Sequence, residues 1–309
     1  MSQIRIASPR PPHKFLSSKM GKPTAEIDLP IGLVRELVQS QHPDLADSPI
    51  REVASGWDNA MFRLGETMAI RLPRRSAAVQ LLEHEQLWLP LLQPQLPLPV
   101  PAPIRIGRPQ HSYPWPWSIT PWIEGETADR VCLDSDQGIK LATFFEALHT
   151  APPEHAPRNP YRGVRLSQRS AKFTECVSAL ARRGRALDVS LLQLWDTAVE
   201  TPVDVAPTWI HGDLHSKNVL AASGRICGVI DWGDMAQGDR ATDLAATWIL
   251  LPQGDAREQV LKSCKSVSTD TWRRARGWAL LLAVVVLNAA DPALVTVAEL
   301  TLQRLLDGP

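Results

Sequence analysis

The sequence predicts an α+β protein with two lobes, a small β-rich lobe followed by a larger, mostly helical one. The chain has 309 residues, and at about 150 residues per domain this length favours two domains. Short β-type stretches separated by turn residues gather in the first part of the chain. From residue 124 onward, apolar residues recur at helical spacing. We therefore expect a disordered basic tail over 1–24, an N-lobe over 25–123 and a C-lobe over 124–309.

The expected tail carries five basic residues and no acidic residue before Glu26. Prolines at 9, 11 and 12 interrupt any helix there. Two interpretations stay open: a solvated tail, with Met20 as an alternative translation start, or an arm for targeting or nucleic-acid binding. We favour the tail, because runs of charge are usually solvated.

The composition excludes several classes of protein. Apolar residues make up 44% and charged residues 21% of the chain, as in an ordinary globular protein. Thirty-three basic residues balance 33 acidic ones, which argues against a general nucleic-acid binder or a polybasic membrane anchor. The longest apolar run, Trp278–Leu287, has ten residues, whereas roughly 20 are needed to span a bilayer. Without a secretory signal or a Cys-x-x-Cys pair, we expect a reduced, cytoplasmic enzyme or binding protein with neither nucleic-acid nor membrane partners.

Each element expected in the N-lobe has a local cause. Helical spacing of apolar residues predicts a helix over 31–41, and three β-type stretches joined by glycine turns predict an antiparallel meander. Five prolines in 94–103 exclude a central strand or a helix, so we expect an extended connector there. The other expected elements are strands at 50–55, 60–64, 68–72, 104–106 and 115–123 and a helix at 76–92.

The C-lobe is expected to be helical with one polar interruption. Helices are expected at 137–150, 167–182, 191–200, 239–251, 256–264, 269–290 and 292–306. Between them, short strands are expected at 208–213, 219–221 and 226–230, with polar loops between the strands. Acidic side chains at strand ends can converge on one point, so this interruption is where we expect chemistry.

The polar residues of this interruption suit phosphoryl transfer. They are His211, Asp213, His215, Lys217, Asn218, Asp231 and Asp234. A carboxylate together with an amide oxygen suits Mg²⁺, which prefers oxygen ligands and retains waters and substrate phosphates. A second carboxylate can accept the proton of an attacking hydroxyl. Positioning and charge neutralisation do most of the work in such reactions.

These residues also carry a family resemblance. His211-Gly-Asp213-Leu-His-Ser-Lys-Asn218 resembles the His-x-Asp-x-x-x-x-Asn catalytic loop of the protein-kinase-like superfamily, and Asp231-Trp-Gly233 resembles its metal-binding Asp-x-Gly. The glycine after the histidine and His215 after the aspartate are similar to the aminoglycoside phosphotransferase family, which includes kinases of macrolides, choline-like compounds and other small metabolites. The resemblance covers roughly residues 25–300 and implies a two-lobed, protein-kinase-like fold.

The resemblance also implies roles for individual C-lobe residues. Asp213 would be the catalytic base, and Asn218 and Asp231 would hold Mg²⁺. His211 and Asp243 would brace the catalytic loop. For His215 two interpretations stay open, a contact with the γ-phosphate or hydrogen bonding within the loop.

For the N-lobe, the resemblance implies the nucleotide-binding residues. Arg71 stands where the family has a phosphate-binding lysine, and we choose Glu85 over Glu83 as its partner. Arginine keeps the charge but differs in reach and geometry. The turn between the first two strands either contacts phosphate or is simply a hairpin turn. The other implied positions are Ser55 and Asn59 in that turn, Pro121 and Ile123 at a hinge that binds the purine, and Ile70 and Ile230 as apolar walls.

The activity implied by the resemblance is transfer of the γ-phosphoryl of ATP or GTP, with Mg²⁺, to a hydroxyl of a small molecule. Only eleven residues separate Asp231 from Asp243, too few for a protein-substrate platform. Candidate acceptors include an aminoglycoside or another antibiotic. The alternative is a nucleotide-binding module with little or no catalysis, because Arg71 replaces the lysine. A metal-dependent hydrolase is the weakest of the three hypotheses.

Overall fold

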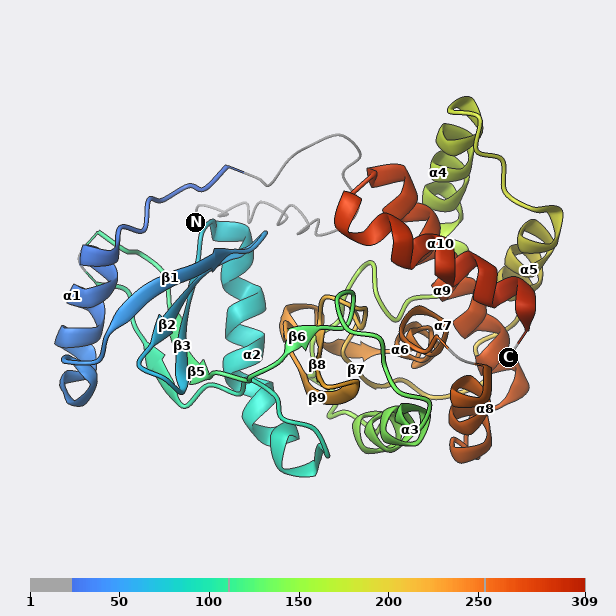
Figure 1. Ribbon diagram of the computed structural model, residues 1–309. Helices are drawn as coiled ribbons and strands as arrows, with labels where there is room; N and C mark the ends of the chain where they lie inside the picture. The colour runs from blue at the N-terminus through green and yellow to red at the C-terminus, as the bar shows by residue number, and fades with distance from the viewer. Residues whose placement is uncertain (1–23, 111, 253, 309) are drawn as a thin grey trace, which may run out of the picture. The chain divides into compact units, whose positions relative to one another are not determined.

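The computed structural model describes residues 24–110, 112–252 and 254–308 (Figure 1). The tail expected over 1–24 therefore lies outside the described residues, except for residue 24. Two compact units make up the chain. Of the described residues, the first unit comprises those up to Gln86 together with Pro103–Trp122, and the second comprises Leu87–Ala102 and those from Ile123 onward.

The segment 87–102 belongs to the second unit, although the sequence placed it in the N-lobe. Two contacts explain the difference. The ring of Trp88 packs 5.3 Å from the ring of Trp209, centroid to centroid. The carbonyl of Pro99 accepts a hydrogen bond of 3.0 Å from Val229 N. The segment 87–102 therefore packs against residues of the second unit that lie more than a hundred positions later in the sequence.

The first unit is built on a five-stranded antiparallel sheet in the order β1-β2-β3-β5-β4. Helices α1 and α2 lie on opposite sides of this sheet (Figure 1). Buried apolar side chains of α1, including Val34 and Leu37, pack with Phe62 and Ile70 of the sheet. The bounds are α1 (Ile31–Gln41), β1 (Ile50–Ser55), β2 (Asn59–Leu64), β3 (Met68–Pro73), α2 (Val79–Leu92), β4 (Arg105–Gly107) and β5 (Trp117–Pro121), with short 3-10 turns at Pro43–Leu45 and Ser76–Ala78. The last residues of α2 and the 3-10 turn at Gln93–Gln95 that follows belong to the second unit.

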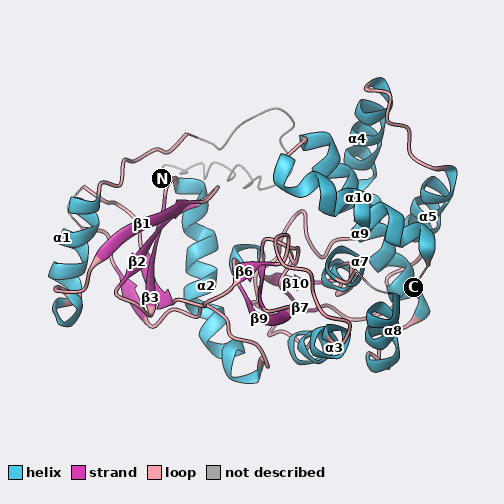
Figure 2. Ribbon diagram, in the orientation of Figure 1, coloured by secondary structure: helices cyan, strands magenta, loops and turns pink. Residues whose placement is uncertain are grey.

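The second unit is mostly helical and contains two small sheets (Figure 2). One sheet has the order β6-β8-β9 and the other pairs β7 with β10. Its strands are β6 (Glu126–Thr127), β7 (Thr208–Ile210), β8 (Val219–Ala222), β9 (Arg225–Val229) and β10 (Ala236–Gly238). Its helices are α3 (Gln137–Leu148), α4 (Ser170–Arg182), α5 (Val189–Glu200), α6 (Ala241–Leu244), α7 (Ala246–Leu250), α8 (Gly254–Ser263), α9 (Thr269–Ala289) and α10 (Pro292–Asp307), with 3-10 turns at Leu166–Arg169 and Trp232–Asp234.

Helix α9 is the central helix of the second unit. The side chain of Ser268 caps its first turn by accepting a hydrogen bond from Thr271 N. The apolar run that begins at Trp278, which is fully buried, fills the core between neighbouring helices. None of the helices within the described ranges combines the length and the apolar character needed to cross a membrane.

The α+β prediction is confirmed, and the differences are local. The helix expected over 239–251 is divided into α6 and α7, and it begins later because the Asp239 side chain accepts a hydrogen bond of 3.1 Å from Ala241 N. The strand expected over 208–213 ends at Ile210. Strands β6 and β10 were not predicted, because two or three residues are too few to show an alternation of apolar and polar side chains.

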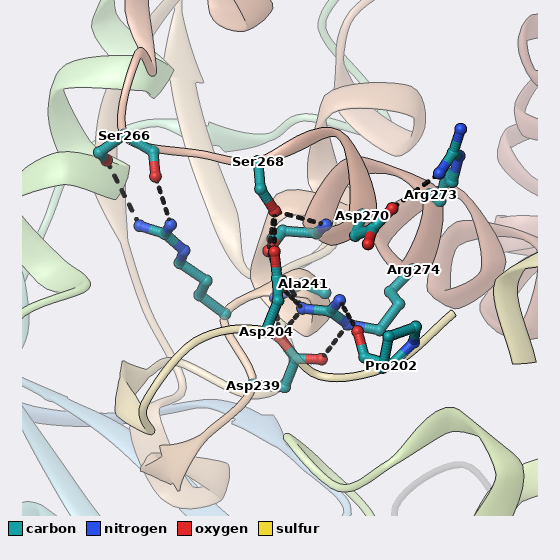
Figure 3. A network of polar contacts seen from close by, with 11 residues as sticks. Pro202, Asp204, Asp239, Ala241, Ser266, Ser268, Asp270, Arg273 and Arg274 are labelled. Carbon is teal, nitrogen blue, oxygen red and sulfur yellow. Dashed lines mark hydrogen bonds and ion pairs between the residues drawn. The ribbon is translucent and has the colours of Figure 1, made fainter. Parts of the chain in front are cut away.

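A buried arginine of α9 binds the residue that precedes α6 and so holds the two helices together. Arg274 of α9 donates from Nε to Asp239 Oδ2 at 2.7 Å and from Nη2 to Asp204 Oδ1 at 3.0 Å (Figure 3). Burial disfavours its charge, but the hydrogen bonds and charges of the two carboxylates outweigh that effect, so the pKa of Arg274 is raised. The pair with Asp239 therefore fixes where α6 begins.

We expect Arg274→Ala to lower the free energy of unfolding by about 3–5 kcal/mol, because it leaves a buried carboxylate without its partner. The adjacent Arg273 provides a matched control, since its ion pair with Asp270 is largely exposed. Arg273→Ala should change stability by at most about 1 kcal/mol. Urea unfolding of both variants measures the difference, and equal losses would contradict the assignment.

A second prediction concerns pH. Burial raises the pKa of Asp204, but hydrogen bonds from Ser268, Arg274 and Thr271 outweigh it and lower the pKa to about 2. Because this folded-state value lies below the ordinary value of 3.8, Asp204 contributes stability above about pH 4 and loses it as the pH falls toward 2. The stability difference between the wild type and Asp204→Asn should thus shrink between pH 5 and pH 3 in urea titrations. A difference independent of pH would refute this.

Candidate active site

The loop between β7 and β8 brings three of the predicted residues together. Asp213 is buried, and Asn218 donates from Nδ2 to the Asp213 carbonyl oxygen at 2.8 Å. The same nitrogen lies 3.4 Å from Asp213 Oδ2, as does Nε2 of His215. The loop therefore holds the Asp213 carboxylate in a fixed orientation. His215 hydrogen-bonds within the loop, and its contact with a γ-phosphate stays a prediction.

Asp243 of α6 holds the start of this loop through its backbone. Its side chain is fully buried. Oδ2 accepts a hydrogen bond of 2.7 Å from His211 N, and Oδ1 accepts one of 2.9 Å from Gly212 N. Nε2 of His149 lies 3.3 Å from Oδ2. Both carboxylate oxygens are therefore occupied by donors, and two of these donors are consecutive peptide groups of the loop.

The ring of His211 joins the loop to the chain that leads to Asp231. Nε2 donates to the Ile230 carbonyl at 3.0 Å, and Nδ1 accepts from Asp213 N at 3.2 Å. These partners require the neutral imidazole with its proton on Nε2. Burial lowers the pKa of His211, and the nearby Asp243 carboxylate opposes that effect without reversing it. A neutral, buried imidazole with both nitrogens engaged acts as a structural link.

Gly212 is required by the backbone. Its φ is +83°, a left-handed conformation that glycine adopts without strain. A Cβ at this position would lie 2.5 Å from the Asp234 carbonyl oxygen. The glycine between His211 and Asp213 therefore allows the loop to approach the turn that follows Asp231.

Asn218 and Asp231 lie at the same end of the β8–β9 hairpin. Val219 pairs with Val229, and Ile230 N donates to the Asn218 carbonyl at 2.9 Å. Asp231 itself adopts a left-handed conformation, with φ 59° and ψ 68°. Non-glycine residues in this region carry strain that is concentrated at functional sites.

The side chains of Asn218 and Asp231 fit Mg²⁺. Asn218 uses Nδ2 to bind Asp213, and no residue in the described part of the chain donates to its Oδ1. An amide oxygen and a carboxylate are hard oxygen ligands, and Mg²⁺ bound through one or two of these also takes substrate phosphates. The donor set therefore suits this ion.

Arg162 is a site residue that sequence reasoning missed. Its Nη2 lies 2.5 Å from Asp213 Oδ1, and its side chain is 8% exposed. Asn159 shapes the preceding turn by accepting hydrogen bonds from Tyr161 N and Arg162 N. The only signal in the sequence is an Asn-Pro turn, which does not indicate a partner 51 residues away.

A close approach of two glycines positions the Arg162 turn. Gly163 has φ +64°, and a Cβ there would lie 2.8 Å from the Cα of Gly238 in β10. Gly163 N also donates to Thr242 Oγ1 of α6 at 3.0 Å. The turn that carries Arg162 is therefore held against the same helix that carries Asp243.

In the first unit, Arg71 of β3 pairs with Glu85 of α2. Arg71 Nη2 lies 3.1 Å from Glu85 Oε1, and both side chains are buried. The expectation that Ile70 forms a wall on this face is wrong. Ile70 is fully buried in the cluster that packs against α1. Alternation along a strand puts Ala69, not Ile70, on the same face as Arg71.

The other residues predicted to contact the nucleotide are Ser55, Asn59, Pro121 and Ile123. Gly56 N donates to the Asn59 carbonyl at 2.7 Å, which closes the turn between β1 and β2. Ser55 ends β1, and its side chain is outside what the structure describes. Pro121 pairs with Met68 at the end of β5, so only its carbonyl can hydrogen-bond a ligand. Ile123 belongs to the second unit.

The chain is similar to known phosphotransferases. Residues 49–278 match the model of the phosphotransferase enzyme family. Aminoglycoside 3'-phosphotransferases of Escherichia coli and Salmonella typhimurium are each 30% identical over 137 residues. Each of these matches covers 42% of this chain and 51% of the relative, so the chain matches about half the length of these relatives.

Solved structures match over most of the chain. The GDP and kanamycin complex of an APH(2″) enzyme has a TM-score of 0.65 at 20% identity, covering 89% of this chain and 99% of that one. The macrolide 2'-phosphotransferase of Brachybacterium faecium has a TM-score of 0.58 at 17% identity, covering 90% and 98%. These likenesses confirm the kinase-like fold. Since the family model matches well over half of its residues, the chain belongs to the phosphotransferase enzyme family.

Proposed function

We propose that this protein transfers the γ-phosphoryl group of ATP or GTP to a hydroxyl of a small molecule. The observation that carries the proposal is the geometry of Asp213 and Asn218 in a loop held by Asp243. Family membership supports the same reaction class.

Asp213 has the position and surroundings of a general base. Arg162 holds one of its carboxylate oxygens, and the Asn218 amide and His215 lie near the other. A carboxylate fixed in this way can orient an acceptor hydroxyl and accept its proton as the oxygen attacks phosphorus. Because the side chain does not need to reorganise, positioning alone accounts for a large share of the rate.

Asn218 and Asp231 would hold Mg²⁺ through the amide oxygen and the carboxylate. When bound, the ion neutralises charge on the β- and γ-phosphates of the nucleotide. Arg71, oriented by Glu85, would bind the α- and β-phosphates, and a guanidinium can do so with two parallel hydrogen bonds. We thus assign nucleotide binding to the N-lobe and acceptor binding to the C-lobe, in the cytoplasm.

The relatives suggest aminoglycosides and macrolides as acceptors to test. The alternative function, nucleotide binding with little or no catalysis, is favoured by one observation, the arginine in place of the phosphate-binding lysine. Purified protein, Mg²⁺ and ATP or GTP should be incubated with pooled antibiotics and small alcohols, with products followed by mass. A product heavier by one phosphate supports the enzyme, whereas nucleotide binding without product from any pool supports the alternative.

We expect Asp213→Asn to lower kcat by about 10²–10⁴-fold, because the amide cannot accept the proton of the hydroxyl. The nucleotide dissociation constant should stay within about twofold of the wild-type value, since the amide keeps the shape of the carboxylate. Asp270→Asn, at an exposed ion pair on α9, is the matched control and should retain kcat. Wild-type turnover in Asp213→Asn would refute the role of the base.

A further inference from the structure

We infer that Arg169 is a binding site for an oxyanion, and that this oxyanion is a substituent of the acceptor. The inference rests on the proposed phosphotransfer and specifies its substrate class: a hydroxylated compound that also bears a carboxylate or phosphate group.

Arg169 differs from the other buried arginines. Seven arginines are buried in the described part of the chain: Arg63, Arg71, Arg162, Arg169, Arg257, Arg274 and Arg304. Six of them donate to a carboxylate or to a backbone carbonyl. Arg169 is 7% exposed, yet no residue that the structure describes accepts a hydrogen bond from its guanidinium.

An unpaired buried guanidinium is unfavourable for folding. Arginine stays charged under nearly all conditions. Of the three guanidinium nitrogens only Nε is completely enclosed, so the loss of hydration is partial, and the charge still favours an acceptor. Its protein contacts do not compensate for this. The guanidinium carbon lies 5.3 Å from the ring centroid of Tyr161, and the charged or titratable neighbours are Arg162, Tyr161 and Cys176, none of them a carboxylate. Burial, together with the charge of Arg162, lowers the pKa of Arg169.

The position of Arg169 connects it to the catalytic base. The Tyr161 ring that faces its guanidinium belongs to the residue before Arg162, and Arg162 contacts Asp213 at 2.5 Å. An oxyanion bound at Arg169 would thus lie beside the turn that orients the base, where an acceptor has to bind. Arginine binds carboxylate and phosphate oxygens with two donors in one plane. The positive charge of Arg169 would disfavour a polycation such as kanamycin.

The first test is thermal and needs no turnover. Inorganic phosphate in the millimolar range should raise the wild-type Tm by about 2–4 °C, as expected when a ligand binds only the folded state. Arg169→Met keeps the apolar stem of the side chain and removes the charge. Its Tm without phosphate should equal or exceed that of the wild type, and phosphate should not raise it. Arg182→Gln, an exposed arginine on α4, should respond like the wild type.

Each other outcome overturns the inference. If Arg169→Met melts well below the wild type and neither responds to phosphate, Arg169 is a structural residue. If saturating ADP abolishes the wild-type response, the site binds a nucleotide phosphate and not the acceptor. A response of equal size in Arg169→Met places the anion elsewhere.

The second test measures which acceptors the enzyme phosphorylates. Hydroxy acids and sugar phosphates should be phosphorylated in preference to aminoglycosides, and Arg169→Gln should lower kcat/KM for an anionic acceptor by about 10–100-fold, the size of a lost charge-assisted hydrogen bond. Turnover of kanamycin in preference to every anionic alcohol would overturn the inference and leave phosphotransfer intact. Absence of all phosphotransfer, with the phosphate response present, would refute the proposed function and leave the oxyanion site.

Discussion

The candidate active site depends on the Asp243 carboxylate, which accepts hydrogen bonds from two consecutive peptide N–H groups of the catalytic loop. With His149 on the same carboxylate, all of its partners are donors, so the charge is stabilised without an arginine or lysine. Carboxylate hydrogen bonds to backbone N–H groups are short and strong. This contact fixes the peptide planes before Asp213 and therefore the direction in which the base emerges.

Several segments that are distant in sequence support this contact. Arg274 of α9 holds Asp239 at the start of α6, and α6 carries Asp243. Thr242 of the same helix binds the Gly163 turn, which delivers Arg162 to the base. The short helix α6 thus holds both the backbone of the catalytic loop, through Asp243, and the turn that carries Arg162, through Thr242. The polar groups of this region are fixed by burial and hydrogen bonding, as a preorganised site requires.

The sequence predicted what depends on local patterns. The loop residues from His211 to Asn218 and the long helices follow from motif spacing and apolar periodicity. Arg162 and Arg169 could not be predicted in this way, because no local pattern marks them. Arg162 matters because folding brings it to Asp213, and Arg169 matters because folding buries it without an acceptor. The error at Ile70 was avoidable, since a strand that points Arg71 toward α2 must turn its neighbour toward α1. Strands β6 and β10 are set by tertiary pairing and have no pattern of their own.

The most direct measurement combines amide hydrogen exchange with turnover in Asp243→Asn. We expect the amides of His211 and Gly212 to exchange faster than in the wild type by orders of magnitude, while the amides of α9 stay protected. Phosphoryl transfer should be lost in the same variant. Unchanged protection of these two amides would show that the loop does not depend on Asp243. Wild-type turnover once that protection is lost would show that catalysis does not depend on this contact.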